Sequence, residues 1–345
     1  MTKIKKSNMK QTFMMVLAIS CFLLLSCGSG KRKSVSQSVD NNVQRLNETV
    51  KVPLFDADSA YQYTKAQCDF GSRVPNSKSH KACAHYLANK LRSFGAQVTE
   101  QKADLIAYDG QMLHCVNIIG AYKPKSKKRI ALFSHWDSRP FADHDPDISN
   151  RKTPIDGAND GASGVGVLLE IARQIQLKSP TIGVDIIFFD AEDYGAPKDY
   201  KGEKKDEYWC LGSQYWARQP HINDYMARYG ILLDMVGGKD ATFYYEYYSM
   251  QYASKLTKKI WTVAKEIGYD KYFIPIEGGG VTDDHVFVNQ LMHLPTTDII
   301  PYHENNTHST FGSTWHTLND NMSAISVETL KAVGQTVITV VYREQ

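Results

Sequence analysis

Residues 130–137 (IALFSHWD) and 184–193 (VDIIFFDAED) flank residues 161–176 (GASGVGVLLEIARQIQ). Each flanking stretch is a short apolar run that ends in charged or imidazole side chains. In the middle stretch, apolar residues recur at steps of three and four, which is the period of an amphipathic helix. A strand, a helix and a second strand in this order form the repeating unit of sheets that are covered by helices. These three stretches therefore predict an α/β fold.

The same alternation extends along the rest of the chain. We expect further helices over residues 59–67, 79–94, 252–267 and 327–342, and further strands over residues 97–106, 112–119 and 231–233. Asp109-Gly110 predicts a hairpin turn between the first two of these strands. The aromatic stretch 243–248 predicts a half-exposed strand. Together the segments predict a single domain with a central, twisted, mixed and mostly parallel sheet and helices on both faces.

The N-terminus has the composition of an export signal. A lysine-rich start precedes an apolar run over residues 13–25 that is short for a membrane span. The run ends in Leu24-Leu25-Ser26-Cys27, which resembles a bacterial lipoprotein signal with a lipid on Cys27. An ordinary signal peptide with an incidental cysteine is the alternative. We expect an exported protein that is lipid-anchored in the cell envelope, on the periplasmic or outer-membrane face, and attached to the membrane through this lipid alone.

The expected organisation has three parts. Residues 1–27 are a signal peptide, residues 28–52 a flexible tether rich in small and polar residues, and residues 53–345 the catalytic domain. The formal net charge of +3 comes largely from the two N-terminal parts, so the domain is close to neutral and we expect no nucleic-acid partner. We expect a monomer. No disulfide is predicted for the domain cysteines, which lack CxxC spacing: Cys68, Cys83, Cys115 and Cys210.

Polar side chains follow three of the expected buried strands. His135, the pair Glu192-Asp193, and Asp234 each come directly after an apolar run. In sheets of this type, ligands bind in the crevice outside the carboxyl ends of the strands, so these side chains are expected to lie close together. Carboxylate oxygens and imidazole nitrogens are ligands for divalent metals such as zinc. The pattern therefore predicts a metal-dependent enzyme.

Two of the acidic positions have simpler explanations. Asp160, within residues 156–164 (DGANDGASG), precedes a helix and is suited to capping its N-terminus as well as to binding metal. Glu192 and Asp193 are either an exposed acidic turn or a pair with divided roles, one binding metal and the other moving protons. A buried carboxylate at Asp234 needs a partner.

The motifs HWDS, GANDGASG, FFDAED, LLDMVG, DDH and WHTLNDN, in this order, resemble the zinc aminopeptidase and glutaminyl cyclase superfamily. The resemblance extends from about residue 55 to the end of the chain. The later segments, residues 282–285 (TDDH) and 315–317 (WHT), are more similar to glutaminyl cyclases. The resemblance implies conversion of the N-terminal glutamine of peptide or protein substrates into pyroglutamate, with release of ammonia.

The same resemblance implies roles for individual residues. Asp160, Asp193 and His316 match the ligands of a single zinc ion, and Glu192 matches the acid/base. The other matches are the acidic active-site residues Asp234 and Asp283 and the pocket-lining Trp315. Trp209 is a further pocket candidate, with structural packing as the alternative, and we also expect His135 and Asp298 to contact the substrate. Asp193 stands where animal cyclases have Glu, and Asp298 stands where they have His.

Two other functions fit parts of this pattern. His135 and Asp234, with Asp160 as a bridge, also match the second-metal ligands of two-zinc aminopeptidases, which hydrolyse N-terminal residues. A surface-binding protein with an inactive site is the other alternative. The presence of every expected ligand and of the acid/base argues against an inactive site.

Overall fold

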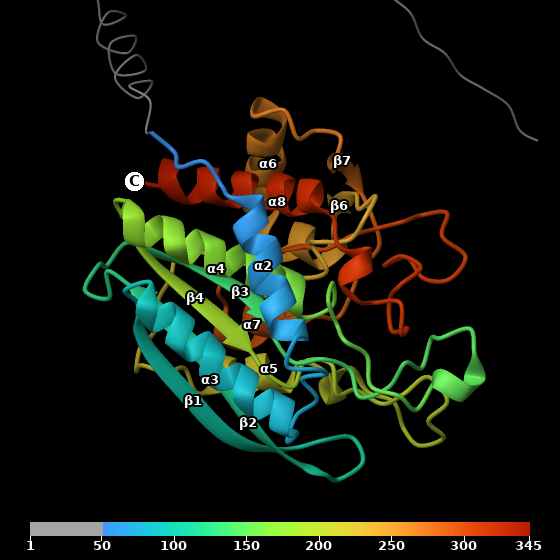
Figure 1. Ribbon diagram of the computed structural model, residues 1–345. Coiled ribbons are helices and arrows are strands. Elements are labelled where there is room, and N and C mark those ends of the chain that lie inside the picture. Colours follow the sequence, from blue (N-terminus) through green and yellow to red (C-terminus); the bar gives the residue numbers. More distant parts are fainter. Residues whose placement is uncertain (1–50) are drawn as a thin grey trace, which may run out of the picture. The chain divides into compact units, whose positions relative to one another are not determined.

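The computed structural model describes residues 51–345 (Figure 1). The expected signal peptide, Cys27 and nearly all of the expected tether lie outside the described residues. Within residues 51–345, no helix combines the length and the apolar composition that crossing a membrane requires. The four cysteines of this part of the chain are free thiols.

The central sheet has six strands in the order β1-β2-β4-β3-β5-β8. They are β1 (Gln97–Ile106), β2 (Met112–Tyr122), β3 (Arg129–His135), β4 (Gly183–Phe189), β5 (Gly230–Leu233) and β8 (Thr296–Ile299). β1, β2 and β4 pair antiparallel, whereas β4, β3, β5 and β8 pair parallel. The prediction of a mixed, mostly parallel sheet is confirmed.

Helices cover both faces of the sheet. They are α2 (Ala57–Cys68), α3 (Lys78–Ser93), α4 (Ala162–Leu177), α5 (Leu211–Arg218), α6 (Tyr247–Glu266), α7 (Asp284–Met292) and α8 (Val327–Arg343). Figure 1 looks onto the face covered by α2, α3, α4 and α8, with α5 and α7 behind the sheet. Along β3, Leu132 belongs to the core on the first face and Phe133 to the core on the second. Every residue of β3 and β4 is buried, as expected for strands covered on both sides.

The packing of α2 against α4 depends on a glycine. A Cβ atom added at Gly166 in α4 would lie 2.2 Å from Oγ1 of Thr64 in α2. The two helix backbones therefore approach closely at this position, which only glycine permits. This contact fixes α4, whose N-terminus follows Asp160.

The segments predicted from the sequence are present, and most begin or end within a few residues of the predicted positions. The exception is the aromatic stretch 243–248, where the prediction of one strand is partly wrong. β6 (Phe243–Tyr245) is short and pairs with β7 (Phe273–Glu277) in a separate sheet, and α6 begins at Tyr247. The carboxylate of Glu246 accepts hydrogen bonds from the N–H groups of Tyr248 and Ser249, and this cap starts the helix.

Candidate catalytic and metal-binding site

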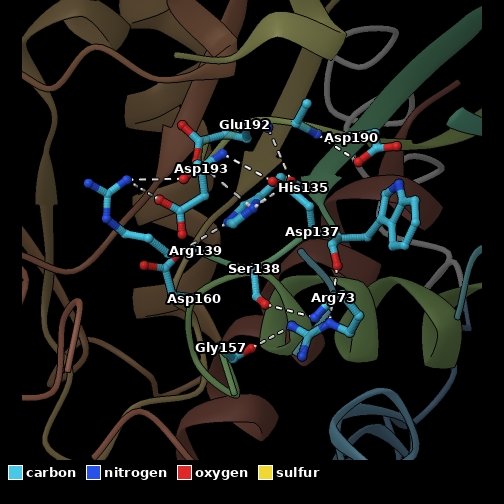
Figure 2. A network of polar contacts seen from close by, with 12 residues as sticks. Arg73, His135, Asp137, Ser138, Arg139, Gly157, Asp160, Asp190, Glu192 and Asp193 are labelled. Carbon is cyan, nitrogen blue, oxygen red and sulfur yellow. Dashed lines mark hydrogen bonds and ion pairs between the residues drawn. The ribbon is translucent and has the colours of Figure 1, made fainter. Parts of the chain in front are cut away.

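The candidate site lies at the carboxyl ends of the parallel strands. His135 ends β3, Glu192 and Asp193 follow β4, and Asp234 follows β5. Figure 2 shows His135, Asp160, Glu192 and Asp193 gathered in one place. The prediction that these side chains converge from separate parts of the chain is confirmed by this arrangement.

Asp160, Asp193 and His316 form a compact group of potential metal ligands. One donor atom from each residue lies within 4.8 Å of the others. Nε2 of His316 is 3.3 Å from Oδ1 of Asp193 and 3.6 Å from Oδ2 of Asp160. Oδ2 of Asp160 and Oδ2 of Asp193 are buried and have no hydrogen-bond partner within the described residues. Two carboxylates with unpaired buried oxygens beside an imidazole fit a divalent cation such as zinc.

Asp160 is positioned by another acidic residue, Asp320. The Asp320 carboxylate accepts hydrogen bonds from the backbone N–H groups of Asn159 and Asp160, at 2.7 and 3.1 Å. The N-cap residue of α4 is Gly161, with φ of 102°, and no side chain caps this helix. The simpler explanation of Asp160 as a helix cap is therefore wrong, and its side chain is left free to face Asp193 and His316.

Glu192 lies on the other side of Asp193 and is held in two ways. Both oxygens of the Asp137 carboxylate accept backbone N–H groups, one from Glu192 at 3.1 Å and one from Asp193 at 3.2 Å. The thiol of Cys210 donates to Oε1 of Glu192 at 3.2 Å. The alternative of an exposed acidic turn is wrong, because Asp193 is buried and Glu192 is only partly accessible.

His135 joins Asp160 to Asp234. Its Nε2 atom is 3.0 Å from Oδ1 of Asp234 and 3.2 Å from Oδ1 of Asp160. One donor atom from each of these three residues lies within 4.8 Å of the others, so this is a second group able to hold a metal ion. The partner that a buried Asp234 requires is His135.

Two further acidic side chains, Asp283 and Asp298, are buried in this region of the structure. Asp283 caps the N-terminus of α7, and its Oδ2 is buried without a partner in the described part of the chain. Asp298 on β8 is also buried, with Oδ2 3.7 Å from Nδ1 of His285. The other ring nitrogen of His285 is 3.0 Å from Glu246. These contacts place a buried acid network beside the potential metal ligands.

Burial raises the pKa values of several of these acids. The pKa of Glu192 is raised well above its usual value by burial and by the neighbouring charges of Asp193 and Asp283. The pKa of Asp234 is raised to about 7, because burial outweighs the opposing hydrogen bond from His135. Burial also raises the pKa of Asp298. Carboxyl groups with raised pKa values can take up and release protons near neutral pH.

A cavity of about 150 Å³ opens onto these residues. Its acidic and metal-binding lining includes Asp160, Glu192, Asp193, Asp234, Asp283 and His316. Trp209 and Trp315 form aromatic walls, and the Trp315 ring stacks on His316 with centroids 3.8 Å apart. His135 and Asp298 lie behind this cavity, with exposed fractions of 1% and 0%.

Arg139 and Asp143 support the site, although the sequence did not single them out. Arg139 is buried and donates to the Asp193 carbonyl at 3.0 Å, and its guanidinium lies beside Asp193 in Figure 2. Trp209 covers the guanidinium with its ring centroid at 4.6 Å. Asp143, paired with Arg139, has Oδ1 3.4 Å from Nδ1 of His316. Their only sequence signal is their position after the HWD motif.

Backbone strain also marks the site. Of the nine described non-glycine residues with positive φ, four lie at or beside the site, with φ between 50° and 56°: Ala191, Cys210, Met235 and His316. Ala191 precedes Glu192 and Met235 follows Asp234. Such conformations cost energy and tend to concentrate at functional sites, where the surrounding structure holds them.

Comparisons with known proteins show the family of this chain and several relatives. The model of "Peptidase family M28" matches residues 117–341. The structure resembles that of Bacteroides thetaiotaomicron glutaminyl cyclase bound to N-acetylhistamine, with 60% identity and a TM-score of 0.84, over 86% of this chain and 100% of the other. A Bacteroides thetaiotaomicron structure described as a leucine aminopeptidase precursor matches with 60% identity and a TM-score of 0.83, over the same shares. Glutaminyl-peptide cyclotransferase of Drosophila melanogaster is 25% identical over 74% of this chain and 73% of its own length.

Proposed function

The chain belongs to peptidase family M28, and from this premise we propose that it is a glutaminyl-peptide cyclotransferase. Such an enzyme converts the N-terminal glutamine of a peptide or protein into pyroglutamate and releases ammonia. The observation that carries the proposal is the convergence of Asp160, Asp193 and His316 beside Glu192 in a small acidic cavity. The similarity of the chain to solved glutaminyl cyclases supports a cyclase rather than another member of the family.

We assign the metal position to Asp160, Asp193 and His316. Two carboxylates and one imidazole form a ligand set that suits zinc and leaves a coordination position open. The unpaired buried oxygens of Asp160 and Asp193 support this assignment, because isolated buried charges are costly. When bound there, zinc would polarise the side-chain carbonyl of the substrate glutamine as a Lewis acid.

Glu192 is the proposed acid/base. The α-amine of the substrate attacks its own side-chain carbonyl carbon, so a new C–N bond forms and the bond to the amide nitrogen breaks. The Glu192 carboxylate takes the proton from the attacking amine and returns it to the departing nitrogen, which leaves as ammonia. A raised pKa suits a group that must both accept and donate near neutral pH. The Asp137 and Cys210 contacts hold it in place.

The remaining side chains position the substrate. Asp234 and Asp283 line the cavity near Glu192, where their oxygens accept hydrogen bonds from the substrate amine or from the leaving group. Trp315 and Trp209 form walls that hold the glutamine side chain folded back toward its own amine. Folding a flexible chain into the reacting geometry removes a large part of the barrier. His135 and Asp298 do not line the cavity. His135 positions Asp160 and Asp234, and Asp298 contacts His285.

A two-zinc aminopeptidase is the second candidate, favoured by the group His135, Asp160 and Asp234. The name of one similar structure, leucine aminopeptidase precursor, supports the same alternative. The two functions are separated by measuring zinc per folded chain together with turnover of glutamine naphthylamide and leucine naphthylamide. A cyclase with one zinc turns over only the glutamine compound. Two zinc ions and faster turnover of the leucine compound would establish the aminopeptidase.

We propose further that the protein acts outside the cytoplasm, anchored through a lipid on Cys27. This proposal rests on the N-terminal sequence. Palmitate labelling of the expressed full chain tests it. Label should be incorporated into the wild-type chain and lost in Cys27→Ala, whereas label retained by the variant would contradict the anchor.

A further inference from the structure

A second, larger cavity has no role in the proposed chemistry. Its volume is about 540 Å³, more than three times that of the catalytic cavity. It is lined by the turn after Asp234 and by the segment between β8 and α8. Side chains on its walls include Asn159, Lys239, His303, Phe311, Ser313 and Asn319.

The two cavities are neighbours. Phe311 lines both, and its ring packs on Trp315 with centroids 5.0 Å apart. The chain also passes from one cavity to the other at Thr314-Trp315, with Thr314 lining the large cavity and Trp315 the catalytic one. A third, small cavity shares Phe311 with both. Phe311 therefore stands at the boundary between the catalytic cavity and the larger one, whereas the small cavity also shares Val281 and Ile300 with the catalytic cavity.

Another part of the catalytic cavity is bordered by the loops that carry Asp206, Trp209 and Thr282. Thr282 donates to Asp206 at 3.2 Å, which joins the two loops that border the cavity there. Trp209, on the same border, is held against the Arg139 guanidinium. The catalytic cavity has room for about one residue, so the rest of a peptide substrate must leave it. The side at Phe311 leads to further space for that chain.

The larger cavity has a polar lining. The side chains of Lys239, Ser313 and Asn319 on its walls are exposed, so they are accessible to hydrogen-bond a molecule that enters it. His303 is half-buried, and burial lowers its pKa, so its ring is neutral at pH 7 and both donates and accepts. Such groups suit the amides and polar side chains of a peptide better than a lipid or an apolar ligand.

Building on the proposed function, we propose that the larger cavity binds the third and later residues of the substrate, with the second residue lying at Phe311 between the two cavities. Its size accommodates about three residues of a polar peptide. The chain passes over Phe311, and its amides bond to the side chains of Ser313, Asn319 and Lys239. Contacts made away from the reacting atoms increase kcat/KM when they help to hold the reacting end in place. The enzyme is therefore selective for longer, polar glutaminyl peptides.

The test compares two substrates with the zinc-loaded protein, a glutamine dipeptide amide and a glutamine pentapeptide amide with polar residues at positions two to four. For the wild type, kcat/KM is expected to be about tenfold higher for the pentapeptide. Ser313→Trp fills the cavity, and Lys239→Ala removes one contact. Each should lower kcat/KM for the pentapeptide by about fivefold and leave the value for the dipeptide unchanged. Lys258→Ala, at an exposed position of α6, is the matched control for Lys239→Ala and should change neither value.

The outcomes distinguish this inference from the proposed function. Equal kcat/KM values for the two substrates, or equal losses for both in the Ser313→Trp and Lys239→Ala variants, would overturn the inference while cyclisation of the dipeptide upholds the function. If the zinc-loaded wild type cyclises neither substrate, the proposed function fails and the inference fails with it. Should Ser313→Trp not fold, Lys239→Ala with its control decides the question.

Discussion

The Arg139 guanidinium binds the Asp143 carboxylate through two hydrogen bonds, from Nε to Oδ1 and from Nη2 to Oδ2, each 2.8 Å long. Both residues are buried, and Oδ1 of Asp143 also faces Nδ1 of His316 at 3.4 Å. A carboxylate in this position selects the ring orientation in which the other nitrogen of His316 faces Asp160 and Asp193. Arg139 thereby acts on the metal site through Asp143.

Asp143→Asn is expected to weaken zinc binding. The amide keeps the shape of the carboxylate but not its charge, so His316 loses the partner that orients it. Loss of such outer contacts typically lowers metal affinity by about tenfold to a hundredfold. The measurement is zinc affinity in competition with a chelator of known affinity. Asp270→Asn, at an exposed position whose side chain forms no hydrogen bond or ion pair with the described residues, is the control and should leave the affinity unchanged. Equal affinities in Asp143→Asn and wild type would contradict the role of Asp143.

Cys210 is expected to position Glu192 for catalysis. Its thiol donates to Oε1 of Glu192, and burial raises the thiol pKa, so the sulfur stays protonated and remains a donor. Cys210→Ala should reduce kcat for a glutamine substrate by about fivefold, the value of one lost hydrogen bond. Cys210→Ser should recover part of the loss, because a hydroxyl also donates. Cys83→Ala, which removes a buried thiol from α3, should leave kcat unchanged. An unchanged kcat in Cys210→Ala would contradict the role of Cys210 in positioning Glu192.

The stability of the protein should depend on pH through Glu246. Burial acts to raise the pKa of this carboxyl, but hydrogen bonds from His285 and from the N–H groups of Ser249 and Tyr248 outweigh burial and lower it below its ordinary 4.5. A lowered pKa in the folded state stabilises the fold above pH 4.5, and this contribution is lost as the pH falls through the folded-state value.

Comparing the wild type with Glu246→Gln tests this dependence. At pH 7 the variant should have a free energy of unfolding lower by about 2 kcal/mol, as expected for hydrogen bonds to a charged group. The difference should shrink as the pH is lowered below 4.5, where the wild-type carboxyl also becomes neutral. Denaturant unfolding at a series of pH values measures it. If the difference in the free energy of unfolding stays constant down to the lowest pH at which the protein is folded, the effect comes from packing and not from the charge of Glu246.

The elements that the sequence predicts well have strong local patterns. The strands β1, β3 and β4 and the helix α4 have clear periods and are close to their predicted bounds. By contrast, α7 and β8 were not predicted. Both are short, and their positions depend on contacts with distant parts of the chain, such as the hydrogen bond from the N–H of Asp298 to Oγ of Ser249.

The same distinction holds for the site. Asp160, Glu192 and Asp193 can be predicted as site residues from the sequence, because Glu192 and Asp193 follow an apolar strand and Asp160 lies in a glycine-rich motif before a helix. Cys210 has no such signal, and Asp320, although it lies in the WHTLNDN motif, has no role that the motif indicates. Each acts on a site residue distant in the sequence, Asp320 through the N–H of Asp160 and Cys210 through Oε1 of Glu192. Only the folded chain shows these contacts.

Glu192→Gln tests the central claim most directly. The variant keeps the size of the side chain but cannot take up the proton of the substrate amine. Wild type and variant are first analysed for zinc, and a peptide that begins with glutamine is then incubated with each and followed by mass spectrometry. One zinc per chain is expected in both proteins, with a product lacking one ammonia formed by the wild type and essentially no product formed by the variant. Wild-type turnover in the zinc-loaded variant, or release of free glutamine by the wild type, would contradict the account.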